Sequence, residues 1–380
     1  MSAPTILLSA GEASSDMYAA RLARDLRERT GARIFGMGGP RMAEAGVELI
    51  ADYHEVAVVG IAEVLHKIPS VVSVQNRLAR EAVRRQADLA ILVDSPGTHL
   101  GVARRLKPKK IPVGYFIGPQ IWAWRAGRVR IVRRRVKKMV VIFPFEEKIY
   151  RDAGVPVEFV GHPLVDVVKA SLTREQFAAK HGLDLTRPIV TLLPGSRKNE
   201  IARNYPAVAQ ACAALLRSGG KSAESQFVLV AAHGLGPQLF ASHEPPGLKV
   251  HRIEDCAYDA LAAADCAIVA SGTATIEAAL LAAPMVVVYR VSSLSAFLAR
   301  PLIRTQFFAM PNVIAGKQVV PELIQSDLTA EAVRNAAQQL IESSDARSEM
   351  RARLAAVSSR LGPGGAIERA ADAFAAMLQG

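Results

Sequence analysis

Asp94 is an acidic residue whose neighbours in the sequence suit proton transfer. It ends the apolar run LAILV and precedes Ser95-Pro96-Gly97, so it is expected at the carboxyl end of a buried strand. A carboxylate in that position can be partly removed from water, which raises its pKa toward that of a general base. The position equally suits an Asx-type turn cap, and the nearby His99 suits an ordinary packing or surface role.

Glu12 lies in a second segment of this kind, SAGEASSD (9–16), where a strand is expected to end and a helix to begin. Its small residues let a substrate approach the backbone, and a helix N-terminus offers free N–H groups with a partial positive charge. A glutamate at a strand end suits a sugar hydroxyl or a proton better than a phosphate. The alternative is that Ser14, Ser15 or Asp16 caps the helix.

Two further segments have the composition of a diphosphate site. Pro194-Gly195-Ser196-Arg197 combines small residues with a guanidinium that can fork onto a diphosphate. Residues 271–277 offer hydroxyls and first-turn N–H groups, and Glu277 could accept hydrogen bonds from a ribose diol. The alternative for 271–277 is a well-capped helix with an acid in its first turn.

Asn312 is a weaker candidate, because it could add an amide contact to a nucleotide or start the next segment. Two familiar nucleotide motifs are missing. The chain contains no GxxxxGK[ST] pattern and no GxGxxG after a strand, which disfavours nucleotide triphosphatases and dinucleotide oxidoreductases.

The excess positive charge lies in one segment. The 380 residues include 47 Lys and Arg against 35 Asp and Glu, a net charge of +12. Residues 101–138 contain thirteen basic residues and no acidic one, which leaves 34 bases against 35 acids elsewhere. Such an excess favours an anionic partner: a nucleic acid, a membrane surface or a phosphorylated substrate.

The two tryptophans, Trp122 and Trp124, lead directly into the densest part of this segment. Aromatic rings beside cations suit a membrane interface or a single-stranded nucleic acid, and equally the edge of a packed core followed by a solvated basic helix. Arg128, Arg135 and Lys138 are predicted to share a helical face. The acid-free stretch favours an anionic surface. The residues predicted to face it are Trp122, Trp124, Arg128, Arg133, Arg134 and Arg135.

Strands and helices must alternate to position these side chains. Short apolar runs, each followed by a helical pattern, occur at 5–9, 89–93, 112–117, 189–193, 227–231, 267–270 and 285–289. Continuous rather than alternating hydrophobicity marks strands covered on both faces, which predicts an α/β fold with parallel sheets. Two similar units open with helical patterns at 17–29 and 205–217.

The pattern predicts two doubly wound, Rossmann-like domains facing a cleft. The first covers 1–166 and the second 167–345, and 346–380 is a helical segment expected to pack back on the first domain. Open α/β sheets bind ligands outside the carboxyl ends of their strands, so the site is expected between the two halves.

No segment has the pattern of an export signal or a membrane span. The first apolar run has no basic start and ends at Gly11-Glu12, and the most apolar stretch, 268–289, is interrupted by polar residues and a proline. The three cysteines have no CxxC spacing, which argues against a disulfide framework and a zinc site and predicts buried thiols in a reducing cytosol.

Together, the motifs resemble those of the lipid-A-disaccharide synthase family, bacterial glycosyltransferases of lipopolysaccharide biosynthesis. The resemblance covers nearly the whole chain and keeps the family's order. The segments that carry it are SAGEASSD (9–16), GMGGPRM (36–42), VVGIAEVL (58–65), GPQIWAWR (118–125), FPFE (143–146), FVGHPLVD (159–166), LLPGSRKNE (192–200), ASGTATIE (270–277), VVVYR (286–290) and MPNVIAG (310–316).

This resemblance implies a glycosyltransferase fold of the B type and an inverting transfer without a metal ion or other cofactor. 2,3-Diacylglucosamine would pass from its UDP conjugate to 2,3-diacylglucosamine 1-phosphate, giving a β(1→6) disaccharide and UDP. Asp94 or Glu12 would take the acceptor's proton, and Arg197 would neutralise the diphosphate. The implied substrate-binding residues are Ser196, Arg197, Gly272, Thr273, Ala274, Glu277, Asn312 and Gln120.

The chain departs from the family's pattern in three places, while Asp94 and Glu12 are retained. The departures near Asp94 fall where the acceptor would be positioned. The differing residues are Ser15 for glycine, Gly118 for serine, and Gly97, Thr98 and His99 for Asp, Phe and Asn.

Both implied substrates carry fatty chains and phosphate. The resemblance therefore implies a protein attached peripherally to the cytoplasmic face of the inner membrane, meeting that anionic surface through 101–138. One alternative is another UDP-sugar enzyme of the same fold, such as a cell-wall glycosyltransferase or a 2-epimerase. A nucleic-acid-binding protein is an alternative of another class, but no zinc, RNP or helix-turn-helix signature supports it, so no nucleic acid is expected. The oligomeric state is left open.

Overall fold

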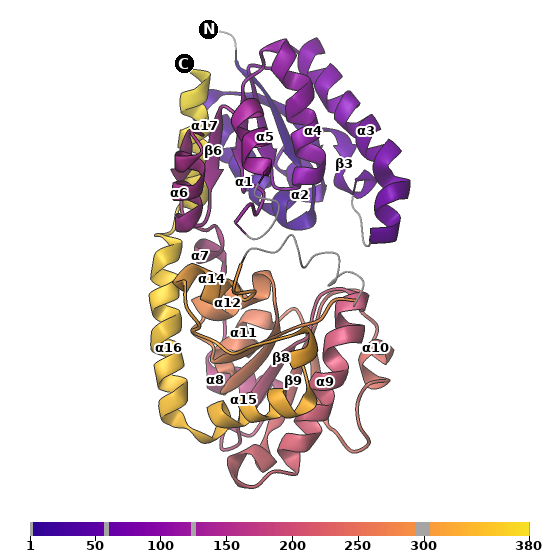
Figure 1. The fold of residues 1–380 in the computed structure, drawn as a ribbon, viewed down its shortest axis with the longest axis vertical. Coiled ribbons are helices and arrows are strands. Elements are labelled where there is room, and N and C mark those ends of the chain that lie inside the picture. The colour runs from indigo at the N-terminus through magenta and orange to yellow at the C-terminus, as the bar shows by residue number, and fades with distance from the viewer. Residues whose placement is uncertain (1–2, 57–60, 123–126, 293–304, 380) are drawn as a thin grey trace. The chain divides into compact units, whose positions relative to one another are not determined.

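The computed structural model describes residues 3–56, 61–122, 127–292 and 305–379, with the backbone alone for 61–66. The chain divides into two compact units (Figure 1). The first consists of Met1–Pro163 and Leu361–Gly380, and the second of Leu164–Arg360. Each unit has its own parallel sheet, and the units are described one at a time.

The first unit is built on a seven-stranded sheet in the order β3-β2-β1-β4-β5-β6-β7. Every strand pair in it is parallel. The strands are β1 (Thr5–Ala10), β2 (Arg33–Gly38), β3 (Glu48–Asp52), β4 (Leu89–Val93), β5 (Val113–Phe116), β6 (Lys138–Val141) and β7 (Val157–Phe159).

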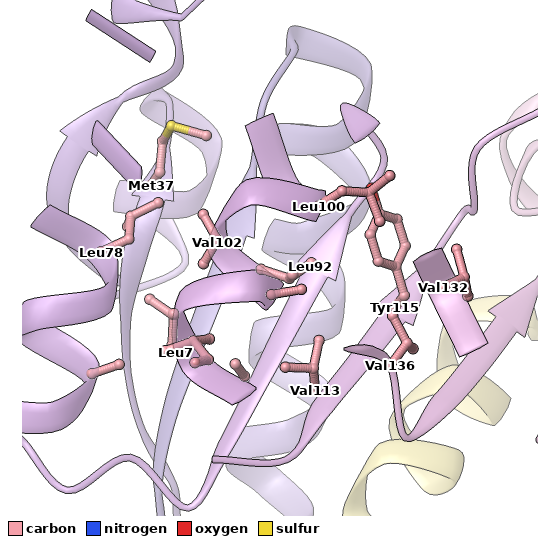
Figure 2. Packing of buried hydrophobic residues seen from close by; sticks show 14 of the residues in the cluster. Leu7, Met37, Leu78, Leu92, Leu100, Val102, Val113, Tyr115, Val132 and Val136 are labelled. Carbon is pink, nitrogen blue, oxygen red and sulfur yellow. The ribbon is translucent and has the colours of Figure 1, made fainter. Parts of the chain in front are cut away.

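Helices cover both faces of this sheet. On one face, Leu78, Leu100 and Val132 from three helices pack with Leu92 and Tyr115 of the strands in one apolar cluster (Figure 2). On the other face α1 packs beside α17, the C-terminal helix, which belongs to this unit although the second unit precedes it in the sequence (Figure 1). The helices are α1 (Ala13–Thr30), α2 (Pro40–Glu44), α3 (Ile61–Arg84), α4 (Pro96–Leu106), α5 (Arg128–Arg135), α6 (Pro144–Asp152) and α17 (Ala366–Ala375), with 3₁₀ turns η1 (Tyr53–Glu55), η2 (Lys107–Lys109) and η7 (Ala376–Leu378). The 3₁₀ turn η6 (Ser359–Leu361) spans the boundary between the two units.

The second unit has a six-stranded parallel sheet in the order β10-β9-β8-β11-β12-β13. Its strands are β8 (Ile189–Leu193), β9 (Gln226–Ala231), β10 (Val250–Glu254), β11 (Cys266–Ala270), β12 (Met285–Tyr289) and β13 (Glu322–Ile324). Its helices are α7 (Leu164–Val167), α8 (Arg174–His181), α9 (Lys198–Leu216), α10 (Gln238–Ala241), α11 (Ala257–Ala263), α12 (Thr273–Leu280), α14 (Met310–Ala315), α15 (Ala330–Glu342) and α16 (Ser344–Ser358), with η3 (Gly220–Glu224) and η5 (Gln325–Asp327).

The predicted α/β class with parallel sheets is confirmed, and each predicted apolar run forms a strand. Strands such as β4 and β11 are buried at every residue, as continuous hydrophobicity requires when helices cover both faces. The strands not predicted are short or carry polar side chains. For example, β10 has the sequence VHRIE and is the edge strand of its sheet, paired on one side with β9.

Two predictions about helices are wrong. Lys138 does not share a helical face with Arg128 and Arg135, because α5 ends at Arg135 and Lys138 opens strand β6. Helix α9 begins at Lys198 rather than at residue 205, and Pro206 lies inside it. Within the described residues, every helix is too short or too polar to cross a membrane. All three cysteines are free, with Cys212 and Cys266 buried.

Candidate active site

The first unit places its two candidate acids at the point where the strand order reverses. Strands β1 and β4 are neighbours, and the chain proceeds from β1 toward β3 on one side and from β4 toward β7 on the other. Glu12 follows β1 and Asp94 follows β4, so both lie at the carboxyl edge of the same sheet. Such a switch point is where open α/β sheets bind their ligands.

Gly11 allows the two turns that carry these acids to pack closely. A Cβ atom on Gly11 would lie 2.3 Å from the Ser95 hydroxyl oxygen, so any larger residue would push the turns apart. The Ser95 hydroxyl is buried and has no hydrogen-bond partner among the described residues. The SAG and DSP segments are therefore one structural site, although more than eighty positions separate them in the sequence.

Asp94 is partly buried, and its pKa is raised from 3.8 to about 6. Burial is the largest cause and the charge of Glu12 the second, while a backbone hydrogen bond from Ser95 acts in the opposite direction. Glu12 itself is exposed. The structure thus brings the two predicted acids together and gives Asp94 the pKa of a base that works near neutral pH.

The neighbours of Glu12 have structural contacts. The buried Ser15 hydroxyl accepts a hydrogen bond from the Glu12 N–H at 2.9 Å and donates to the Glu12 carbonyl at 2.8 Å, which fixes the first turn of α1. Asp16 does not cap α1. Its carboxylate accepts hydrogen bonds from the backbone of Gly39 and Arg41 and so caps α2 instead.

Glu146 in the FPFE segment is a buried acid near this site that sequence reasoning did not single out. Only 2% of its surface is exposed, and its pKa is raised to about 8, first by burial and in small part by the charge of Asp94. It accepts a hydrogen bond from the Phe143 N–H at 3.3 Å. The signal for it in the sequence was an acid directly after three apolar residues, which predicts burial but not a role.

Trp122 lies against this segment rather than on an open surface. Its indole contacts the ring of Phe145 edge-on at 5.2 Å, and Phe145 stacks on Phe143 at 5.5 Å. Trp122 is therefore partly buried in an aromatic cluster, as in the alternative of a tryptophan at the edge of a packed core. Gln120 is exposed two residues earlier. Trp124 falls outside the described residues.

Several basic residues of 101–138 lie at the other edge of the first sheet. Lys107 and Lys110 precede β5, and Lys137 precedes β6, so these lysines lie at the amino ends of the two strands. Both strands run parallel to β4, so Asp94 lies at the opposite, carboxyl edge of the sheet. Together with Arg134 these lysines line an open groove of about 550 Å³ that also includes the apolar Met377 and Leu378.

The predicted cations of α5 differ in how exposed their side chains are. Arg133 and Arg134 are exposed, whereas Arg135 is partly buried and donates to the Leu100 carbonyl at 2.9 Å. Burial and the charges of Arg104 and Arg134 lower the pKa of Arg135. Arg128 is partly buried at the start of α5. The basic surface is therefore formed mainly by Arg133, Arg134 and the lysines.

The second unit contains a pocket of about 570 Å³ at the carboxyl ends of its central strands. It collects the diphosphate candidates of both predicted segments, together with residues that the sequence reasoning did not name. The predicted residues in its lining are Ser196, Arg197, Gly272, Thr273, Ala274 and Glu277, and the unpredicted ones include Glu200, His233, Asp255 and Tyr289.

The turn before α9 presents two hydrogen-bond donors to one carboxylate. The Ser196 N–H donates to Glu200 at 3.0 Å and the Arg197 guanidinium donates to the same side chain at 3.1 Å. Gly195 adopts a φ of +142°, and a Cβ atom there would lie 2.6 Å from the Cβ of Glu200. The turn therefore gathers donors around an anionic group, as a diphosphate site requires.

The second wall of this pocket is the start of α12. Gly272 precedes the helix, and the first-turn N–H groups of Thr273 and Ala274 have no partner within the helix itself. Glu277 lies one turn on, accepts a hydrogen bond from Tyr258 at 3.1 Å, and has a pKa raised by burial. These groups can bind an anion and a diol side by side.

Asn312 differs from the other predicted substrate-binding residues. It is fully buried and is not among the residues that line the pocket. Its amide nitrogen donates to Val320 and Glu322, and its oxygen accepts from Val319 and Val320. The amide is thus occupied in holding α14 to the segment before β13, which leaves it no ready atom for a nucleotide.

Among the described residues, no group of three or more His, Cys, Asp or Glu side chains is arranged to hold a metal ion. The pocket of the second unit contains the acids Glu200, Asp255 and Glu277, and there Arg197 and the N-terminus of α12 can balance the charge of an anion.

Solved structures of low sequence identity share this architecture. The UDP-GlcNAc 2-epimerase of Neisseria meningitidis, solved with UDP-GlcNAc, superimposes with a TM-score of 0.65 at 14% identity, covering 97% of this chain and 99% of that one. MurG of Acinetobacter baumannii superimposes with a TM-score of 0.58 at 13% identity, covering 98% and 99%. The fold is thus the two-domain, Rossmann-like arrangement of B-type glycosyltransferases and these epimerases.

Sequence comparison is more specific than the fold. Residues 6–371 match the family model described as lipid-A-disaccharide synthetase. The lipid-A-disaccharide synthase of Solibacter usitatus is 43% identical over 379 residues, covering 99% of this chain and 98% of that protein. That of Myxococcus xanthus is 42% identical over 377 residues, covering 99% and 98%. The resemblance seen in the motifs therefore extends over the full length, and the chain belongs to the lipid-A-disaccharide synthetase family.

Proposed function

We propose that this protein is an inverting glycosyltransferase that joins UDP-2,3-diacylglucosamine to 2,3-diacylglucosamine 1-phosphate and releases UDP. The observation that carries the proposal is the position of Asp94, a partly buried carboxylate with a pKa of about 6 at the switch point of the first sheet. Membership in the family supplies the substrate class.

In the proposed reaction, Asp94 takes the proton of the acceptor's 6-hydroxyl. The hydroxyl oxygen forms a bond to C1 of the donor sugar while the bond from C1 to the UDP oxygen breaks on the opposite face. Attack from the opposite face inverts C1 and gives the β(1→6) linkage. The proton ends on Asp94 and the electron pair of the broken bond on UDP.

The leaving diphosphate carries negative charge that protein groups must balance. In this proposal the Ser196 N–H, the Arg197 guanidinium and the start of α12 surround it, and Glu277 accepts hydrogen bonds from the ribose. The Ser196 N–H and the Arg197 guanidinium donate to the Glu200 carboxylate in this structure. In the proposed complex they donate to the diphosphate instead. Asn312 is given no contact with UDP in this proposal, because its side-chain amide already binds Val319 and Val320.

The finer part of the proposal concerns the membrane. We infer that the protein binds the anionic cytoplasmic face of the inner membrane through the exposed cations of Arg133, Arg134 and the neighbouring lysines. The support is the local excess of thirteen basic residues in 101–138 and the mixed basic and apolar groove at the amino edge of the sheet.

The activity test uses both acylated substrates in detergent micelles. Equal amounts of UDP and disaccharide 1-phosphate are expected, and Asp94→Asn is the matched inactive control. UDP-N-acetylglucosamine, a donor without acyl chains, distinguishes this enzyme from a 2-epimerase. Epimerisation of that donor, or no disaccharide from the acylated pair, would overturn the proposal.

A further inference from the structure

Asp94 and Ser95 have an unusual backbone conformation. Their φ angles are +54° and +45°, in the left-handed region that residues other than glycine rarely adopt. Two consecutive residues of this kind cost free energy and persist only where the surrounding structure holds them. The contacts that hold this turn therefore also decide where the Asp94 carboxylate lies.

Three hydrogen bonds fix the peptide groups of Asp94. Its N–H donates to the Phe116 carbonyl at 2.9 Å, which continues the ladder between β4 and β5. Its carbonyl accepts two side-chain donors, the Tyr115 hydroxyl at 2.6 Å and Nδ1 of His99 at 2.7 Å. Tyr115 and His99 are both fully buried, and their rings meet edge-on at 6.3 Å.

The geometry determines the form of His99. A carbonyl oxygen only accepts, so Nδ1 carries the hydrogen. Burial lowers the pKa of His99 to about 4, so the ring is neutral at physiological pH and Nε2 keeps its lone pair. The Ser9 hydroxyl, 2.9 Å from Nε2, is then the donor of that hydrogen bond. The chain of hydrogen bonds runs from Ser9 on β1 through His99 on α4 to the Asp94 carbonyl.

We propose that His99 is a positioning residue for sugar transfer: its Nδ1–H holds the Asp94 carbonyl and so keeps the catalytic carboxylate in its left-handed turn beside Glu12. This rests on the proposed role of Asp94 as the base. Ser9 orients the imidazole, and the Tyr115 hydroxyl is a second donor to the same Asp94 carbonyl. Gly11 completes the arrangement, because its missing side chain lets the turn with Ser95 settle against β1.

Two substitutions separate the two ends of the imidazole. Asparagine can place an amide donor near the position of Nδ1, whereas glutamine reaches the position of Nε2 and leaves the Asp94 carbonyl without its donor. Both remove the buried ring, and asparagine, one methylene smaller, loses more packing than glutamine, so lost packing cannot explain a lower kcat in His99→Gln. We expect His99→Gln to lower kcat about tenfold to a hundredfold relative to His99→Asn, with similar KM values for both substrates, because misplacing a reacting group costs rate rather than affinity.

The pH profile gives a second readout. Besides His99, the titratable groups coupled to Asp94 or to Tyr115 are Glu12, Glu146, Tyr150 and Arg128. The acidic limb of kcat/KM is expected near pH 6 in the wild type. In His99→Gln it should move toward the ordinary aspartate value, since a loosened turn lets water reach the carboxylate. A purely structural role for His99 would lower the amount of active enzyme without moving that limb.

Equal kcat values and equal pH limbs in folded His99→Asn and His99→Gln would overturn the proposal. Should His99→Gln fail to fold, Tyr115→Phe tests the same carbonyl by removing the parallel donor, and an unchanged pH limb there would count against the proposal. Asp94→Asn separates the two levels of inference. Turnover by Asp94→Asn would remove the role of Asp94 itself, whereas an inactive Asp94→Asn with equal His99 variants would remove only the role of His99.

Discussion

The side chains of Glu12 and Asp94 lie close enough for the charge of Glu12 to raise the pKa of Asp94. The two acids follow neighbouring strands, β1 and β4, and Gly11 lets their turns pack against each other. The charge of one carboxylate disfavours ionisation of another nearby, and here the pKa of the more buried Asp94 is raised. This relationship favours Asp94 as the base in the proposed reaction, with the exposed Glu12 as a group that raises its pKa or binds substrate.

Replacing Glu12 is expected to change the pH dependence of the reaction. The base works in its ionised form, so kcat/KM should fall as the pH drops below about 6 in the wild type. Glu12→Gln removes a repulsive charge, which lowers the Asp94 pKa and moves this limb to lower pH. Initial rates over the acidic range measure it. A limb that stays in place would mean that another group controls the rate.

Asp94→Asn is expected to stabilise the fold while it abolishes turnover. The unfolded carboxyl ionises near 3.8 and the folded one near 6, so stability falls as pH rises through this window and stays lower above it. Asparagine carries no charge and tolerates a left-handed φ. The gain should be about 1–3 kcal/mol near neutral pH, at about 1.4 kcal/mol per pKa unit, and should vanish in acid where both forms are neutral. Thermal unfolding measures it, with the exposed Asp152→Asn as the control.

Glu146→Gln is expected to flatten the pH dependence of stability between about pH 4.5 and pH 8. The folded protein keeps the Glu146 proton up to about pH 8, whereas the unfolded chain loses it near 4.5. Wild-type stability should therefore decrease as pH rises between these values, and less steeply in Glu146→Gln. Urea unfolding across this range tests it. Identical slopes for the two proteins would show that Glu146 is already ionised in the fold.

Arg197→Ala is expected to weaken UDP binding. A charge-assisted hydrogen bond contributes about 1.5–3 kcal/mol, which corresponds to roughly a 10- to 100-fold rise in Kd. Arg197→Lys should recover part of the loss, because an ammonium keeps the charge but not the planar fork. Titration calorimetry with UDP measures these values. Asp94→Asn is the control and should bind UDP normally, so an equal loss in both variants would contradict the assigned roles.

Reversing two exposed charges of α5 is expected to reduce membrane binding. Each basic residue near an anionic bilayer contributes about 1 kcal/mol, so Arg133→Glu with Arg134→Glu should weaken binding to phosphatidylglycerol vesicles by roughly 30-fold or more. Arg135 is left intact, because it donates to Leu100 in the fold. The matched control reverses Lys249 and Lys317, which are exposed in the second unit. Equal losses in the two double variants would indicate an effect of net charge alone.

The sequence by itself determined the class of the fold, the strands that carry the site and the family. Runs such as LAILV before Asp94 and CAIVA before Ser271 are continuous and apolar, and only strands covered on both faces can bury them. The small residues after these runs predicted ligand-binding turns, and the structure gathers Ser196, Arg197, Gly272 and Glu277 around one pocket.

Tertiary structure alone decided what each polar side chain does within that frame. Asn312 looked like a nucleotide contact, but its amide holds residues 319–322, and Asp16 caps α2 rather than its own helix. His99 looked like a packing residue, but it links Ser9 to the Asp94 carbonyl across 90 positions of sequence. The tertiary structure also brings Lys107, Lys110, Arg134 and Lys137 of the basic segment into one groove at the amino edge of the sheet, opposite Asp94.

The physical reason is the range of the interactions. Hydrophobic periodicity is a local property, because the spacing of apolar residues along a segment reflects the repeat of the strand or helix that the segment forms. Hydrogen-bond partners and pKa values depend instead on which turns the sheet order brings together. For Asp94 this is the turn of Glu12, and for His99 it is Ser9 on the neighbouring strand, and neither proximity can be read from the residues that flank them.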